Sequence, residues 1–315
     1  MNKTKMFKLI IMCFLTMCLS FATPLSSYVS AYNTGDVDTP KGDCASFSEI
    51  EPLAEQLKES LIKAETTEKR QIILQKASLF GLNEIDFKGV YLSENEKSIL
   101  CGETKSKHFA KKQNKSIVSA PTNIASRTVV AGVNMPDYVL APIIYKQEKR
   151  DWCSAGTIQT VLNYVGATSP SQQTIMNAWQ LNWHVPYPDL PYIRNYINPL
   201  LPSDYGDYAT VVYGGSQEIF NSAIQFDVLQ YQPTIIHMAN NTTSTANWPY
   251  KTDGHFCICN GLLTWENNKY YMGDPFYFST YVSGAGNVGT HNRTWSQLNT
   301  VITNKFGSGS QMILF

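Results

Sequence analysis

Charged side chains are scarce in this sequence. Asp, Glu, Lys and Arg make up 16% of the 315 residues, and 25 basic side chains balance 25 acidic ones, so the formal net charge is zero. A chain without an excess of either sign lacks the basic stripe that binds nucleic acid and the acidic tail that attracts a cationic partner. We therefore expect no nucleic acid among its partners.

Long apolar runs are also missing. The one prominent run, "LIIMCFLTMCLSFA" near the N-terminus, falls short of the ~20 residues that a helix needs to span a bilayer. Three lysines precede this run and "YVSA" follows it, which is the order of a secretory signal peptide. We expect residues 1–31 to be that signal, with the protein secreted as an extracellular or cell-surface-associated protein, and we expect no stable membrane insertion.

Cysteine is too rare for a disulfide scaffold of this size. Removal of the signal would take away two of the seven cysteines and leave Cys44, Cys101, Cys153, Cys257 and Cys259. Five is an odd number, so at least one thiol of the secreted chain has no partner within it. A disulfide between Cys44 and Cys101 would leave three thiols in the second half of the chain.

The composition, 43% apolar with no internal repeats, is that of an ordinary globular protein. Residues 46–80 carry leucines and isoleucines at helical spacing and end at Gly81, which predicts one or two helices. Residues 93–127 are rich in Lys, Ser, Asn and Thr, which predicts a linker. We therefore divide the mature chain into a helical N-terminal region with its linker, 32–127, and a second domain, 128–315.

The second domain combines a helix with several strands. "CSAGTIQTVLNYVG", from Cys153 to Gly166, has its apolar residues on one helical face. Residues 234–240, 254–265, 268–276 and the terminal "SQMILF" predict strands, and the middle two are spaced as a hairpin. This order predicts an α+β fold in which a helix packs on an antiparallel sheet.

Cys153 is a candidate nucleophile because it lies where the helix is expected to begin. The reactive form of cysteine is the thiolate, and both a helix N-terminus and a nearby imidazolium favour it. His255 is the best placed of the five histidines because it follows Gly254 at the start of an apolar strand. Asp274 ends the next strand of the predicted hairpin, so it can lie beside His255 and orient its ring.

Acyl transfer also needs donors for the negative charge that develops on the carbonyl oxygen. One candidate is the backbone N–H of Cys153. The side-chain amide of Gln147, six positions earlier on the approaching loop, is another.

These motifs resemble the papain-like cysteine peptidases, and most closely the bacterial C39-like group. The resemblance rests on Gln147, "WCSAGTIQTVLNYVG", "DGHFCICNGL" and "MGDPF" in that order. It implies a papain-like fold and a peptidase in which Cys153 is the nucleophile, His255 the base and acid, Asp274 the orienting residue and Gln147 the oxyanion donor. It also implies a peptide or protein substrate and no cofactor.

Several alternatives remain open at this stage. Cys153 could be an inert buried thiol, or a zinc ligand with His255, Cys257 and Cys259. Among enzymes, a peptidoglycan amidase or endopeptidase of the NlpC/P60 or CHAP type also orders Cys before His, and a papain-like effector or transamidase is a further interpretation. A binding module with a peptidase-like fold and no catalysis is the non-enzymatic alternative.

The helical region before the second domain has two interpretations. Many papain-like enzymes carry a helical pro-region over the cleft, so residues 32–127 could be a removable intramolecular pro-segment. They could equally form a permanent accessory domain.

Overall fold

The computed structural model describes residues 51–102, 117–119, 128–130, 133–135, 138–183, 189–212, 215–238, 247–250, 254–263, 269–276, 289–302 and 312–315. The predicted signal peptide and Cys44 lie outside these residues, as do His108 and His184. All of the described residues belong to one unit of the chain, Thr39–Phe315.

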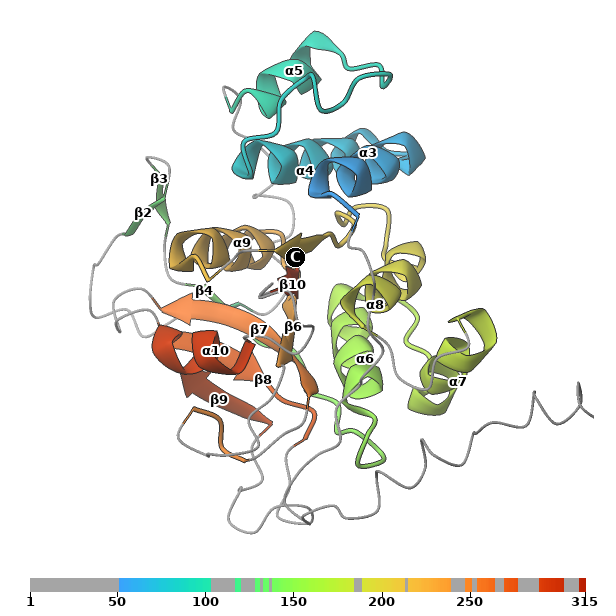
Figure 1. Cartoon of the computed structure of the whole chain (residues 1–315), viewed down its shortest axis with the longest axis vertical. Helices are drawn as coiled ribbons and strands as arrows, with labels where there is room; N and C mark the ends of the chain where they lie inside the picture. The colour runs from blue at the N-terminus through green and yellow to red at the C-terminus, as the bar shows by residue number, and fades with distance from the viewer. Residues whose placement is uncertain are drawn as a thin grey trace, which may run out of the picture. The chain divides into compact units, whose positions relative to one another are not determined.

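An antiparallel sheet organises the fold (Figure 1). Within the described residues its strands follow the order β1 (Ile117–Ser119), β4 (Tyr138–Leu140), β7 (His255–Leu263), β6 (Thr234–Met238), β10 (Met312–Leu314) and β5 (Thr210–Val212). From β7 a second branch leads to β8 (Lys269–Gly273) and then β9 (Thr290–Arg293). The short strands β2 (Thr128–Val130) and β3 (Val133–Met135) pair only with each other in the described part.

The predicted hairpin is confirmed by the pairing of β7 with β8. The register runs from Leu263 opposite Lys269 to Ile258 opposite Gly273, with an irregularity between Cys259 and Gly261. Every residue of β7 is buried, which explains its nearly continuous apolar sequence. The start of β7 and the end of β8 consequently lie at the same end of the hairpin.

Helices cover both faces of the sheet. The helix α6 (Cys153–Val165) packs with α7 (Gln172–Trp183), α8 (Leu190–Ile197) and the short helix η2 (Asn198–Leu200) on one side, whereas α9 (Gln217–Leu229) and α10 (Trp295–Ile302) belong to the other side (Figure 1). Side chains of β6 and β7 alternate between two hydrophobic clusters: Ile235, Phe256 and Ile258 join the α6 cluster, and Ile236, Cys257 and Cys259 join the α9 cluster. This alternation follows from the two-residue period of a strand.

The N-terminal region is helical, as predicted for residues 46–80. It contains α3 (Leu53–Lys63), α4 (Thr67–Leu79) and α5 (Glu94–Leu100). Gly81 follows α4 with φ of 72°, a left-handed conformation suited to a helix end. Among the described residues, no helix is both long and apolar enough to cross a membrane.

The linker interpretation of residues 93–127 is wrong for α5. Ser93 and Glu96 form a capping box, in which each side chain bonds the backbone N–H of the other residue. Ile99 and Leu100 are buried in the hydrophobic cluster that also contains residues of α4 and α9, and α5 packs on α4. The polar composition of this stretch predicted no helix, but two buried apolar residues and a capping box are enough to stabilise a short one.

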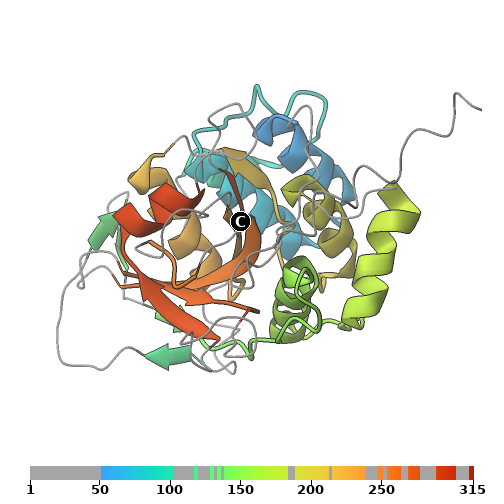
Figure 2. The same cartoon turned by 60° about the horizontal axis from the view of Figure 1, so that its bottom comes forward.

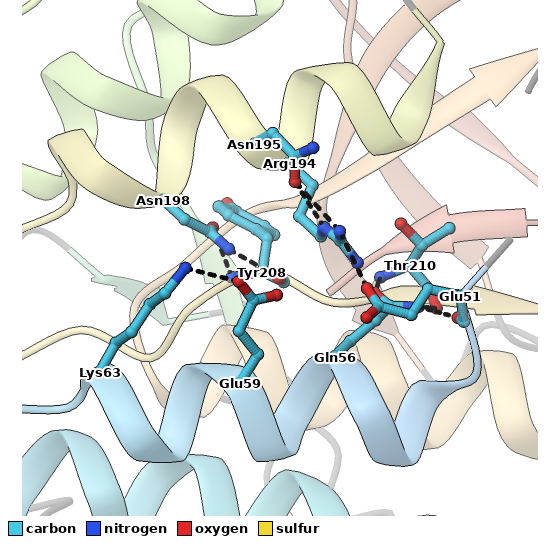
Figure 3. A network of polar contacts seen from close by, with 9 residues as sticks. All are labelled: Glu51, Gln56, Glu59, Lys63, Arg194, Asn195, Asn198, Tyr208 and Thr210. Atoms are coloured by element: carbon cyan, nitrogen blue, oxygen red, sulfur yellow. Dashed lines mark hydrogen bonds and ion pairs between the residues drawn. The ribbon is translucent and has the colours of Figure 1, made fainter.

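Polar contacts join the N-terminal helices to the rest of the fold (Figure 3). The Gln56 amide bonds the backbone of Thr210 in both directions, accepting from its N–H at 2.8 Å and donating to its carbonyl at 3.2 Å. Arg194 of α8 lies 3.3 Å from the Glu51 carboxylate. Both contacts connect residues that are far apart in the sequence.

Lys76 of α4 makes a further polar contact with the rest of the fold, and this contact is fully buried. Its side chain is 0% exposed, its ammonium group donates to the Asp207 carbonyl at 2.9 Å, and it lies 3.9 Å from the buried Asp227 carboxylate. Its Nζ is also 4.7 Å from the centre of the Phe315 ring. Burial lowers the pKa of Lys76 and raises the pKa of Asp227, and each charge partly offsets the shift of the other.

Candidate active site

Cys153 is the first residue of α6. Trp152 precedes it as N-cap and provides no side-chain cap for the helix. The backbone N–H groups at this end and the helix dipole therefore favour negative charge near the Cys153 sulfur. The Cys153 side chain is buried, and it shares a hydrophobic cluster with Phe256, the residue after His255.

Asp274 and His255 meet at the end of the hairpin, as the sequence predicted. His255 Nε2 lies 2.8 Å from Asp274 Oδ1, and both side chains are almost fully buried. Burial tends to raise the pKa of Asp274, but the charge of His255 and the hydrogen bonds from His255 and His291 outweigh it and hold that pKa below its usual range. Asp274 is therefore an anion at neutral pH.

The tautomer of His255 follows from this contact. An ionised carboxylate can only accept hydrogen bonds, so Nε2 must carry a proton. In the neutral ring Nδ1 is then unprotonated, and within the described part of the chain this buried nitrogen has no hydrogen-bond partner. Nδ1 is thus the atom of His255 that can accept a proton.

Gln147 is buried beside this site and connects it to α6. Its backbone N–H donates to the Pro275 carbonyl at 3.0 Å, which ties the Gln147 loop to the segment that carries Asp274. Its side-chain Nε2 donates to the carbonyls of Lys149 and Arg150. Both amide hydrogens are therefore engaged within the loop, whereas the oxyanion role expected for Gln147 needs one of them to be released.

Gly156 allows the first turn of α6 to approach the other two segments. A Cβ atom at this position would lie 2.8 Å from Pro275 Cβ and 3.1 Å from the Tyr145 carbonyl oxygen. The first distance is shorter than two carbon atoms tolerate and the second is tight, so glycine allows an approach that a side chain would prevent. The segments that carry Gln147, Cys153 and Asp274 thus meet around one glycine.

Tyr250 and His291 complete the surroundings of Asp274 and were not singled out from the sequence. The Tyr250 hydroxyl donates to Asp274 Oδ2 at 2.6 Å, and His291 Nε2 lies 3.3 Å from the same oxygen. The backbone N–H of Phe276 donates to Oδ1 at 2.8 Å. Tyr250 and His291 come from separate segments with no fixed spacing to Asp274, so no sequence motif identifies them.

The other thiols of this domain have a different environment. Cys257 and Cys259 are buried on the face of the sheet opposite α6. Burial raises the pKa of both thiols, in the case of Cys259 to about 12, so they stay protonated. Since Cys153 belongs to the cluster on the other face, the three thiols do not form the zinc site considered from the sequence. In the described residues no group of three or more His, Cys, Asp or Glu side chains could hold a metal ion.

Two sequence-based predictions involve positions outside the described residues. Cys101 is exposed at the end of α5, but Cys44, its partner in the disulfide considered from the sequence, is not described. The domain boundary between residues 127 and 128 also adjoins residues that are not described, so both remain predictions. No protein-family model matches the chain, and no curated protein matches it.

Proposed function

We propose that the protein is a secreted cysteine peptidase with a papain-like fold, similar to the C39-like group. The observation that carries the proposal is the buried His255–Asp274 pair at 2.8 Å, at the end of a hairpin whose strand β7 packs on the helix that begins with Cys153. An anionic carboxylate, an oriented imidazole with an unoccupied nitrogen and a cysteine at a helix N-terminus are the groups that acyl transfer requires.

The first half of the reaction would form a thioester. The Cys153 thiol gives its proton to His255 Nδ1, and the thiolate attacks the carbonyl carbon of a peptide bond. The resulting oxyanion is stabilised by the backbone N–H of Cys153 and by the side-chain amide of Gln147. For this role the amide must first break its hydrogen bond to one of the two loop carbonyls. The His255 imidazolium then protonates the departing amine, and the C–N bond breaks.

The second half would regenerate the enzyme. A water molecule gives a proton to His255 Nδ1 and attacks the thioester carbon, which releases the acid and returns the proton to the sulfur. Asp274 keeps its negative charge throughout and stabilises the imidazolium each time it forms. This sequence of steps needs no cofactor.

Thiol alkylation tests the proposed transfer of the Cys153 proton to His255, which leaves a thiolate beside an imidazolium. With reduced full-length protein at pH 6, we expect iodoacetamide to modify Cys153 at least about tenfold faster than the exposed Cys101, because an ordinary thiol with a pKa of about 8.5 is almost fully protonated there. Peptide mass spectrometry after quenching gives the rate at each cysteine.

Two comparisons make this experiment decisive. The preference for Cys153 should disappear in His255→Ala, and it should shrink at pH 9, because ordinary thiols ionise at such a pH. Equal, slow labelling of Cys153 in the wild type and in His255→Ala would contradict the proposal and favour the binding module.

A further inference from the structure

The Asp274 carboxylate has more hydrogen-bond donors than the proposed mechanism uses. His255 Nε2 and the Phe276 N–H lie at Oδ1, and the Tyr250 hydroxyl and His291 Nε2 lie at Oδ2. A carboxylate offers about four lone-pair positions. Each oxygen is therefore approached by two donors, and any rotation of the group about its own axis would break contacts on both sides.

We propose that His291, assisted by Tyr250, is a positioning residue that holds Asp274 in the orientation that serves His255. This inference rests on the proposed function. His291 comes from β9, which pairs with β8 and places Thr290 opposite Gly273. The same register places His291 opposite Met272, two residues before Asp274, and its Nε2 reaches Oδ2, whereas His255 Nε2 lies at Oδ1.

The surroundings of His291 keep its ring in place. The Trp248 ring packs against it edge-on, with the two centres 4.4 Å apart and an interplanar angle of 76°. Arg293 lies over the same Trp248 ring at 5.4 Å from its centre. Because Trp248 is fully buried, it provides a rigid wall, and the His291 side chain, 17% exposed, has little room to turn.

The charges around His291 favour its neutral form. Burial lowers the pKa of His291, Arg293 and His255 lower it further, and Asp274 opposes them. A neutral His291 donates a hydrogen bond without adding a second positive charge beside Asp274. The carboxylate consequently stays fully available to stabilise the imidazolium form of His255.

The test compares two substitutions at one position. His291→Leu removes the donor and keeps an apolar side chain, so we expect kcat to fall about tenfold with KM unchanged, as for the loss of a hydrogen bond to a charged group. His291→Gln keeps an N–H donor and should recover most of this loss.

Further measurements separate this proposal from the proposed function. Tyr250→Phe keeps the ring and removes one donor, so it should lower kcat in the same direction without loss of folding. Iodoacetamide labelling of Cys153 at pH 6 needs no hydrolysis, and its rate should fall in His291→Leu and stay near the wild-type rate in His291→Gln. Equal kcat losses in the Leu and Gln variants, or equal labelling rates of Cys153 in His291→Leu and the wild type, would overturn the positioning role. Absence of any hydrolysis by the wild type would instead contradict the proposed function alone.

A second, independent inference concerns residues 51–102. In Figures 1 and 2 the helices α3 and α4 lie beyond the end of α6 that is opposite Cys153. Their apolar side chains belong to the same hydrophobic cluster as α9, β6 and β10. Gly206 also lies directly against α4, because a Cβ atom there would overlap a methyl carbon of Ile72.

We infer that residues 51–102 remain part of the folded protein after secretion. A pro-segment that leaves must separate without exposing the core of the enzyme. Here the departure of α4 would expose the large cluster that contains Ile73, Leu74 and Phe315, and would remove Lys76 from the buried Asp227 carboxylate. Of the two interpretations of the N-terminal region, these contacts favour the permanent one.

Cleavage of the chain tests this inference. A recognition sequence for a site-specific protease is inserted between residues 102 and 117 of the full chain, and the cut protein is compared with the same protein uncut. We expect both pieces to elute together in size-exclusion chromatography, to separate only in denaturant, and to keep at least about half of the activity of the uncut protein. Release of the N-terminal piece without denaturant, with the remainder still melting cooperatively, would overturn the inference.

Discussion

Replacement of Cys153 by alanine is expected to lower peptide hydrolysis by about a thousandfold or more, because removal of the nucleophile from such a triad eliminates the covalent route. Hydrolysis of fluorescently labelled casein measures this directly. The same proteins incubated with purified peptidoglycan test the amidase and endopeptidase alternatives. Release of peptidoglycan fragments without casein cleavage would move the proposed reaction to the cell wall.

Cys259→Ala is the matched control for this experiment. Cys259 is also a buried thiol, and it lies on the strand that begins with His255, but it belongs to the cluster on the opposite face of the sheet. Its replacement should leave the rate of hydrolysis within about twofold of the wild type, since the lost thiol is protonated and remote from Nδ1 of His255. Hydrolysis that persists in Cys153→Ala would show that another group is the nucleophile.

The second large effect is on stability. Lys76→Met should lower the free energy of unfolding by about 3–5 kcal/mol, because it leaves the buried Asp227 carboxylate without the cation 3.9 Å away. Asp227 keeps a hydrogen bond from the Thr234 hydroxyl at 2.7 Å, which cannot replace a positive charge. Guanidinium denaturation followed by circular dichroism measures the change.

Two further variants identify the cause of this loss. Lys76→Met combined with Asp227→Asn removes both charges and keeps an acceptor for Thr234, so it should recover most of the lost stability. Lys63 forms an ion pair with Glu59 at the surface, where the two side chains are 69% and 52% exposed. Lys63→Met should therefore lower the free energy of unfolding by less than about 1 kcal/mol. Equal losses of unfolding free energy in Lys76→Met and Lys63→Met would show that the buried pair stabilises the fold no more than an exposed one.

Local patterns in the sequence were sufficient for part of this site. The start of α6 at Cys153 follows from apolar spacing, and Gly166 ends the helix in a left-handed conformation with φ of 79°. The contact between His255 and Asp274 follows from the hairpin of β7 and β8. In a hairpin the first residue of the first strand lies next to the residue that follows the second strand. Both inferences need only neighbours in the chain.

The remaining features depend on contacts that no local pattern contains. Tyr250 and His291 converge on Asp274 from segments 24 and 17 positions away. Both hydrogens of the Gln147 amide are engaged by carbonyls of its own loop, and only the three-dimensional path of that loop determines this. The short helix α5 was missed because a capping box and two buried apolar residues were enough to stabilise it within a polar stretch.

The bond between Gln56 and Thr210 also bears on self-association. In the described part of the sheet β5 is the last strand in its row, and the outermost strand of a sheet can recruit a strand of another molecule through its unpaired backbone groups. The Gln56 amide satisfies the N–H and the carbonyl of Thr210 as a neighbouring strand would. A side chain from α3 thereby blocks the position at which a second copy could begin to aggregate.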